Sequence, residues 1–226
     1  MIEEKLIKKA LWSYYHFIKK IDFPFVELDF EKHFATNWER FNQYATSDKK
    51  LPENPTLNNG TLYLCWHFPE YPLLLKSIAK GDILILVADN SEWIVNSISE
   101  EKIYNFKESS FNSKLIHALK RKIPIICMFD YYYSSSKYII SDFLGYPSKT
   151  PYGIIKLALL FEYSINLITD NKDTSGILIN DIGLNSLQKT IDFINKKIET
   201  AILEIPSRWL LWPSIDNRWQ NVDYEL

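Results

Sequence analysis

A histidine at the end of an apolar run is the residue in this sequence whose position best suits chemistry. His67 follows strand-forming residues, and Glu70 comes three residues later, where a helix is expected to begin. In an α/β fold such a strand delivers its last side chains to the crevice at the carboxyl edge of the sheet. A neutral imidazole there can accept a proton from a hydroxyl or an amine, while a carboxylate on its other nitrogen stabilises the imidazolium. The pattern predicts His67 as a general base with Glu70 as its partner.

Two other residues are expected near this edge of the sheet. Asp130 follows a predicted strand at residues 123–129 and would lie beside His67, although a turn or a helix cap is a simpler role. Cys65 would share a strand face with His67, but no further ligands cluster with it, so no metal is predicted. Motifs of serine hydrolases, P-loop enzymes and dinucleotide-binding folds are absent from the sequence. The other histidines lie within predicted helices, where packing or surface roles are expected: His16, His33 and His117.

A segment rich in Gly and Pro, residues 143–153, predicts a tight connection followed by a helix. Thr150 is expected to cap a helix that begins at Pro151, where the missing N–H of proline costs nothing. The free backbone N–H groups of that helix end, with Lys149 and the nearby Gly145, would suit an anion such as phosphate. Gly145, Lys149 and Thr150 are therefore candidate substrate-binding residues, together with Asp130.

The elements that must position these residues alternate along the chain. Apolar runs typical of buried strands fall at residues 62–66, 82–88, 123–129, 164–169 and 176–180. Helical periodicity is found at residues 3–20, 29–45, 70–80, 109–121, 151–163 and 185–205, with Asp29 as the expected cap of the second helix. The polar or aromatic stretches 88–109 and 131–138 follow strands, so they are expected to form walls of the site.

This alternation predicts an α/β fold. Near-continuous apolar strands between amphipathic helices indicate a mixed, largely parallel central sheet that is flanked by helices on both faces. The length of 226 residues suits one domain, 1–226, in which a helical part at 1–60 packs on an α/β core at 61–219.

Composition limits the classes of partner and compartment. A net charge of −2 gives no reason to expect nucleic acid. Cys65 and Cys127 lie in apolar runs, as expected for core residues in a reducing compartment. No apolar run approaches the ~18 residues that cross a bilayer, so a cytoplasmic protein is expected. The aromatic residues, 7 Trp, 14 Tyr and 13 Phe, are compatible with a large core, an apolar groove or peripheral contact with a membrane.

Several segments, in order, resemble the lipid A late acyltransferases, the lauroyl and myristoyl transferases of the lysophospholipid acyltransferase superfamily. Residues 64–70 resemble the family's strand followed by His and an acid, and residues 115–130 resemble its helix, strand and Asp. Residues 143–158 resemble its F-x-G…T-P-x-G…L-A stretch, the most specific match. Residues 194–219 resemble the closing helix and the segment of Pro and Trp, here beginning at Pro206.

The resemblance implies an acyltransferase with this fold. It would move a fatty acyl group from a thioester of acyl carrier protein or coenzyme A to a hydroxyl or an amine, with the His as general base and no bound cofactor. Four departures matter. The family's acid lies five residues after its His, where this chain has Pro72, and an arginine-containing segment is not recognisable at 89–107. The basic residues that follow the Trp segment in the family are reduced here to Asn217-Arg218, and the family's N-terminal membrane helix is missing. The carboxylate beside His67 would then be Glu70 or come from elsewhere, such as Asp130. A smaller or soluble acceptor, or a lipid, is expected.

Two other functions stay open at the level of sequence. A chain that kept the fold but lost catalysis would be a binding protein, which Pro72 favours. A hydrolase would use His67 and water on the same thioester. Trp209, Trp212 and Trp219 could pack inside the protein or form a belt at a membrane surface.

Overall fold

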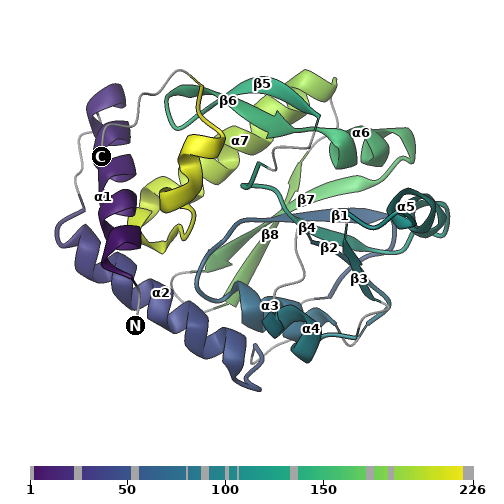
Figure 1. Ribbon diagram of the computed structural model, residues 1–226. Helices are drawn as coiled ribbons and strands as arrows, with labels where there is room; N and C mark the ends of the chain where they lie inside the picture. The colour runs from purple at the N-terminus through teal and green to yellow at the C-terminus, as the bar shows by residue number, and fades with distance from the viewer. Residues whose placement is uncertain are drawn as a thin grey trace.

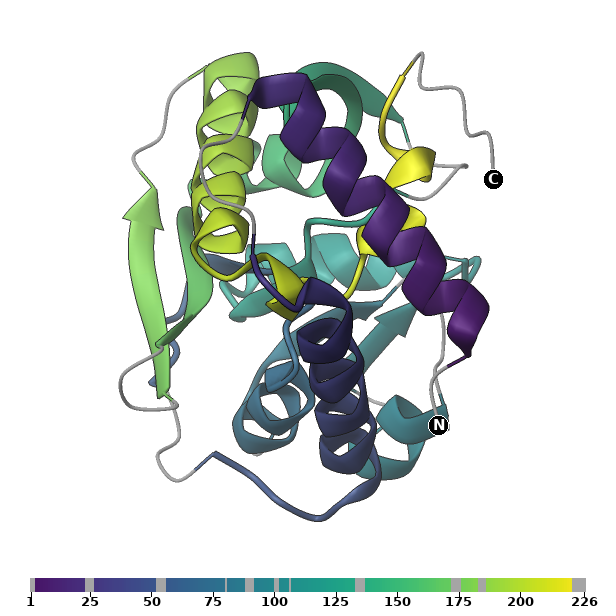
Figure 2. The same cartoon turned by 90° about the vertical axis from the view of Figure 1, so that its left-hand side faces the viewer.

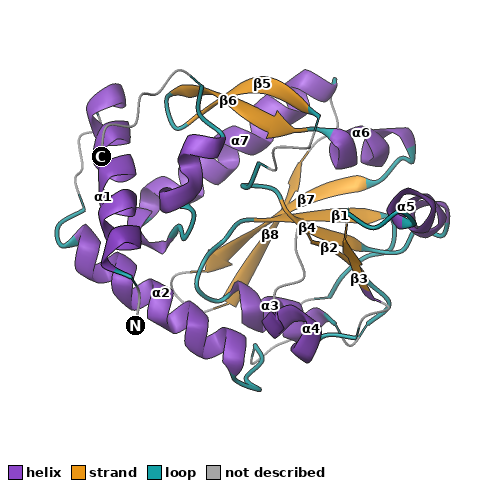
Figure 3. Cartoon of the chain, in the orientation of Figure 1, coloured by secondary structure: helices purple, strands orange, loops and turns teal. Residues whose placement is uncertain are grey.

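A six-stranded sheet forms the centre of the molecule, as the alternating pattern predicts. The computed structural model describes residues 3–22, 27–51, 56–79, 81–87, 92–99, 102–105, 107–132, 137–171, 176–182 and 186–220. The strand order is β3-β2-β4-β1-β7-β8, and every neighbouring pair is parallel except β7 and β8. The strands are β1 (Thr61–Cys65), β2 (Leu84–Val87), β3 (Ile103–Asn105), β4 (Ile125–Met128), β7 (Ser164–Asn171) and β8 (Gly176–Ile182). The predicted largely parallel α/β sheet is confirmed (Figure 1, Figure 3).

Helices and a small hairpin cover the sheet. In Figure 1, α3 (Tyr71–Ile78) and α4 (Glu92–Ser97) lie below it, and α6 (Gly153–Leu160) and α7 (Leu187–Glu204) lie above it. The helix α5 (Phe111–Lys120) leads from β3 to β4. The strands β1 and β4 are almost entirely buried, which explains why their sequences are apolar without alternation.

The N-terminal helices pack against the C-terminal part of the chain. The helix α1 (Glu4–Ile21) contacts the 3-10 helix η3 (Trp212–Asn217), and α2 (Phe30–Thr46) contacts both α3 and the 3-10 helix η2 (Pro206–Arg208). Figure 2 shows α1 crossing in front of these C-terminal segments, which are yellow. The two ends of the sequence therefore meet at one side of the sheet.

Glu27 fixes this meeting of the two ends. Its carboxylate accepts hydrogen bonds from the backbone N–H of Ser207 at 2.8 Å and from the Ser207 hydroxyl at 2.6 Å.

The cap of α2 differs from the expected one, because Asp29 lies in the left-handed region with φ 57° and makes no side-chain capping bond. A side-chain cap requires the extended backbone that Asp29 lacks.

A two-stranded antiparallel sheet, β5 (Tyr138–Phe143) with β6 (Tyr146–Pro151), occupies the segment for which a tight connection and a helix start were predicted. The tight connection is the turn at Leu144 and Gly145. Gly145 has φ +76°, and a Cβ there would lie 2.4 Å from the side chain of Ile21. The predicted helix 151–163 begins only at Gly153, because residues 146–151 pair with β5 in extended conformation.

The core contains most of the large aromatic side chains. Trp209, Trp212 and Trp219 are buried, so they pack inside the protein and form no surface belt. Cys65 and Cys127 are both buried in the core, as predicted, and they form no disulfide. Burial and the nearby Asp130 raise the pKa of the Cys127 thiol to about 12. No helix in the described part of the chain is long and apolar enough to cross a membrane.

Candidate active site

A histidine and a buried aspartate form a close pair at the carboxyl edge of the sheet. His67 Nδ1 lies 2.7 Å from Asp130 Oδ1, and the backbone N–H of His67 donates to Asp130 Oδ2 at 2.8 Å. The Asp130 side chain is 0% exposed, whereas 19% of the His67 side chain is accessible. The pair therefore has one member sealed in the protein and one that solvent can reach.

The register of two neighbouring parallel strands creates this pair. Cys65, the last residue of β1, is paired with Met128, the last residue of β4. The ladder continues for one more hydrogen bond, from the N–H of Phe129 to the carbonyl of Cys65 at 2.8 Å. His67 and Asp130 each come two residues after a member of that last pair, so both side chains arrive at the same place.

Asp130 is surrounded by donors that favour its ionised form. The indole Nε1–H of Trp209 donates to Asp130 Oδ2 at 2.8 Å, beside the two contacts from His67. Burial by itself opposes ionisation of this carboxyl. The charge and hydrogen bonds of His67 and the bond from Trp209 outweigh burial and hold the pKa of Asp130 below its ordinary value. Asp130 is thus an anion at neutral pH, and it faces Nδ1 of the imidazole.

The remaining ring nitrogen of His67, Nε2, is the one available for reaction. Because Asp130 is ionised, it accepts a hydrogen bond, so Nδ1 must carry the proton and Nε2 is left basic in the neutral ring. The ring of Tyr71 meets the imidazole edge-on, with centroids 5.1 Å apart, and the backbone N–H of Leu210 donates to the His67 carbonyl at 3.0 Å. These contacts fix the orientation of the base.

A buried arginine supports the backbone of Asp130. Arg218 is 2% exposed and donates to the Asp130 carbonyl at 3.0 Å. Its other terminal nitrogen donates to Thr150 Oγ1 and Asn195 Oδ1, each at 3.2 Å, and the guanidinium lies 3.9 Å from the centroid of the Phe143 ring. Burial lowers the pKa of Arg218 to about 10, with the charge of Asp130 opposing the shift, so this side chain stays cationic at neutral pH.

Glu70 does not lie on the imidazole as the sequence pattern predicted. Its carboxylate accepts a hydrogen bond from Arg208 at 2.6 Å and lies 3.7 Å from Arg40. Glu70 is the N-cap position of α3, and its side chain makes no capping bond there. Asp130, the second carboxylate that the sequence left open, is the one that contacts His67.

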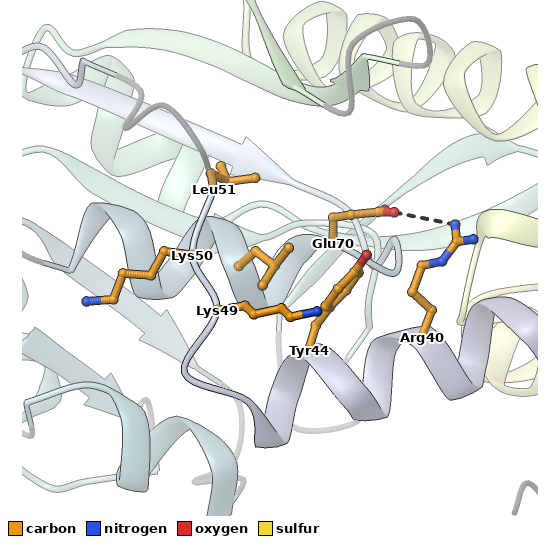
Figure 4. Close-up of a pocket in the computed structure, with 7 residues that line it drawn as sticks. Arg40, Tyr44, Lys49, Lys50, Leu51 and Glu70 are labelled. Carbon is orange, nitrogen blue, oxygen red and sulfur yellow. Dashed lines mark ion pairs between the residues drawn. The ribbon is translucent and has the colours of Figure 1, made fainter.

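A pocket of about 480 Å³ opens next to Glu70. It is lined by residues of α2, the loop that follows α2, and the start of α3: Arg40, Tyr44, Lys49, Lys50, Leu51, Glu70 and Leu73 (Figure 4). Since Glu70 follows His67 by three residues, the pocket lies beside the segment that carries the base. Its size is in the range of small-molecule sites.

The predicted helix cap at Thr150 is wrong, because Thr150 lies in β6 and α6 begins only at Gly153. Thr150 is buried in β6, and its hydroxyl oxygen accepts hydrogen bonds from Asn195 and Arg218 instead of capping a helix. The Lys149 ammonium lies over the rings of Tyr132 and Tyr138, at 5.5 and 5.7 Å from their centroids. Gly145 forms the hairpin turn against α1. The Thr150 hydroxyl and the backbone N–H of Lys149, which donates to the Arg218 carbonyl at 2.8 Å, hold Arg218, and Arg218 in turn holds the backbone of Asp130.

Three residues at the site were missed by reasoning from the sequence. Arg208, Trp209 and Arg218 come from the C-terminal segment, and none of them lies near His67 in the sequence. Their signal was weak: a Pro and Trp segment after a long helix suggests packing, and only the fold brings it to the sheet edge. Parts of both predicted site walls, residues 88–91 and 133–136, lie outside the described residues. The rest of 88–109 contains α4 and β3, which were not predicted.

The arrangement can abstract a proton and stabilise the cation that results. Among the described residues, no group of three or more His, Cys, Asp and Glu side chains is arranged to hold a metal ion.

In comparisons with known proteins, no family model matches the chain and no curated protein matches it significantly.

Proposed function

We propose that the protein is an acyltransferase that moves a fatty acyl group from a thioester to a hydroxyl or an amine. The donor in this proposal is acyl carrier protein or coenzyme A, and the acceptor is a small molecule or a lipid. The choice of acyl transfer comes from the ordered resemblance of residues 64–219 to the lipid A late acyltransferases. The buried pair of His67 and Asp130 supports it with a group that can activate such an acceptor.

The proposed reaction uses Nε2 of His67 as the base. Nε2 removes the proton of the acceptor hydroxyl or amine as that atom attacks the thioester carbonyl carbon. The new C–O or C–N bond forms, the C–S bond breaks, and the imidazolium returns the proton to the departing sulfur. Asp130 accepts the Nδ1–H bond and stabilises the imidazolium while it exists, and no acyl-enzyme forms.

The observation that carries the proposal is the buried Asp130 carboxylate at 2.7 Å from Nδ1 of His67. A binding protein that had lost catalysis has no need to keep a buried carboxylate 2.7 Å from an accessible imidazole. Burying an anion is costly unless its partners compensate, and here His67 and Trp209 supply those partners. This network favours a working base over an inactive scaffold. A cytoplasmic location, where acyl thioesters are made, is part of the same proposal.

Product analysis tests the proposal directly. Purified protein is incubated with a set of acyl thioesters and a cell extract as the source of acceptor, and the products are analysed by mass spectrometry. We expect an acylated acceptor with the wild type, and a loss of at least 10³-fold in its formation rate for His67→Ala, since the general base is removed. Undiminished transfer by this variant would refute the proposed mechanism.

The same experiment separates transfer from hydrolysis. Free fatty acid is counted with and without acceptor. A transferase makes acylated product only when acceptor is present, whereas a thioester hydrolase releases the same amount of free acid in both cases. Release of free fatty acid in the same amount with and without acceptor, and no acylated product, would replace the proposed function with the hydrolase.

A further inference from the structure

The pocket beside Glu70 carries more positive than negative charge. Of its described lining residues, Arg40, Lys49 and Lys50 are basic and Glu70 is acidic. Glu70 is already neutralised by Arg208 at 2.6 Å, where both side chains are largely buried. Arg40, at 3.7 Å from the same carboxylate and 41% exposed, is a second cation on a carboxylate that has a closer partner. The pocket therefore keeps a surplus of positive charge.

The loop that carries the two lysines is held in place. The ammonium of Lys76 donates to the carbonyls of Tyr44, Ala45 and Ser47 at 2.5–2.8 Å. These hydrogen bonds hold the C-terminal end of α2 on α3. At the far end of the loop, the backbone N–H of Leu51 donates to the Ser77 hydroxyl at 2.8 Å. Residues 47–51 are thus fixed at both ends on α3, and the positions of Lys49 and Lys50 follow from that.

The two lysines are directed differently. Figure 4 shows the Lys49 side chain running along the pocket toward Tyr44, while the Lys50 side chain extends away from Glu70. The Tyr44 side chain also points to the Glu70 side of the pocket. Arg40, Lys49 and the Tyr44 hydroxyl therefore form a set of hydrogen-bond donors in the pocket. Leu51 and Leu73 are its apolar lining residues.

We infer that this pocket binds the phosphate group of a substrate, with Arg40, Lys49 and Tyr44 as the donors. A guanidinium and an ammonium are the side chains that phosphate oxygens prefer, and a hydroxyl adds a further donor. The preference for an anion follows from the charges of the pocket alone. The choice of phosphate rests on the proposed function, because thioester donors carry a phosphopantetheine and many acyl acceptors carry a phosphate ester.

The pocket is linked to His67 through neighbouring residues. Glu70 and Tyr71 are consecutive residues: Glu70 lines the pocket, and the ring of Tyr71 contacts His67. On its other side Tyr71 stacks on Phe41, which follows Arg40 in α2, with ring centroids 5.3 Å apart. A phosphate held at Arg40 and Lys49 would therefore lie in a pocket whose lining residue Glu70 is followed directly by Tyr71, a residue that contacts His67.

Titrations with matched pairs of compounds test the inference. The binding of 4′-phosphopantetheine is compared with that of pantetheine, and the binding of glycerol 3-phosphate with that of glycerol, by ligand-observed NMR at low and high salt. We expect the phosphate compound of at least one pair to bind more tightly, with an affinity that falls as salt rises. Preference in the first pair identifies the donor as the source of the phosphate, and preference in the second identifies the acceptor. No preference in either pair overturns the inference.

Two neighbouring variants supply the control. Lys49→Gln and Lys50→Gln remove the same charge from adjacent exposed positions, and the fold of each is checked by circular dichroism. We expect Lys49→Gln to weaken phosphate binding by about 5-fold at low salt, and Lys50→Gln to weaken it less than about 2-fold. Equal effects of the two variants would mean diffuse attraction instead of a site, and would contradict the inference.

The failure of this inference can be told from failure of the proposed function. His67→Ala leaves the pocket residues untouched, so it is expected to bind the phosphate compounds as the wild type does. Loss of transfer in His67→Ala combined with absent phosphate binding would remove only the pocket assignment. Phosphate binding with unchanged transfer in His67→Ala would keep the anion site and remove the base.

Discussion

Two carboxylates were candidates for the partner of His67, and their side chains make different contacts. Asp130, sixty-three positions away in the sequence, is sealed in the core and contacts the imidazole. Glu70, three positions away, turns toward Arg208 and Arg40 at the rim of a pocket. Nearness in sequence therefore did not select the partner of the base; the pairing of β1 with β4 did.

Adjacent residues of the C-terminal segment serve both carboxylates. Arg208 contacts Glu70, and the next residue, Trp209, contacts Asp130. The 3-10 helix that presents them is tied to Glu27 through Ser207. One short segment thus stabilises a buried anion on one side and an ion pair at the pocket rim on the other.

The largest difference is expected between substitutions of the two carboxylates themselves. Asp130→Asn should reduce acyl transfer by about 10³-fold, because an amide cannot hold the imidazole with its proton on Nδ1. Glu70→Gln keeps the shape of the side chain away from the imidazole and should reduce transfer by less than about 10-fold. Initial rates of product formation at saturating thioester measure both. A larger loss in Glu70→Gln would reverse the assignment of the two residues.

A smaller effect is expected from the indole that donates to Asp130. Trp209→Phe keeps an aromatic side chain, although a smaller one, and removes the Nε1–H bond to Oδ2. The loss of a hydrogen bond to a charged group should lower the free energy of unfolding by about 1.5–3 kcal/mol. Transfer should fall about 10-fold, since one of the donors that fix Asp130 is lost. Urea unfolding and steady-state rates measure the two quantities.

Trp212→Phe is the matched control for that substitution. Trp212 is also buried, and its Nε1–H donates to the Pro206 carbonyl at 2.7 Å without touching Asp130. Its substitution should lower stability by about 1 kcal/mol and leave the rate within about 2-fold of the wild type. Equal losses of activity in the two variants would show that Trp209 acts only through packing.

The smallest effect is expected in the pH dependence of stability. The pKa of Asp130 is lower in the folded protein than in the unfolded chain, so the unfolded chain binds more protons in the acid range. The stabilisation is fully present above the unfolded pKa, about 3.9, and is lost as pH falls through the folded pKa. The urea midpoint of the wild type should therefore fall more steeply below about pH 4 than that of Asp130→Asn. Parallel curves would mean that folding does not lower the pKa of Asp130.

The fold was largely predictable because its strands are buried on both faces. Residues 62–66 and 123–129 contain almost no polar positions, which is typical of central parallel strands, and both were found within two residues of their ends. The hairpin of β5 and β6 was missed because Pro151 and Gly153 resemble a helix start. A two-stranded sheet tolerates proline at its edges. The strand β6 buries every second residue, Tyr146, Ser148 and Thr150, but two of these are polar, so the sequence shows no alternation of apolar residues.

The sequence by itself determined that His67 would arrive at the carboxyl edge of the sheet. A histidine that follows a buried parallel strand lies at the carboxyl edge of the sheet, because all parallel strands end at that edge. It also determined that Asp130 would arrive at that edge. Only the tertiary structure decided which carboxylate meets the imidazole, since this depends on β1 and β4 being neighbours in register. The donors Trp209 and Arg218 come from more than 140 positions beyond His67, and local periodicity carries no information about a contact at that separation.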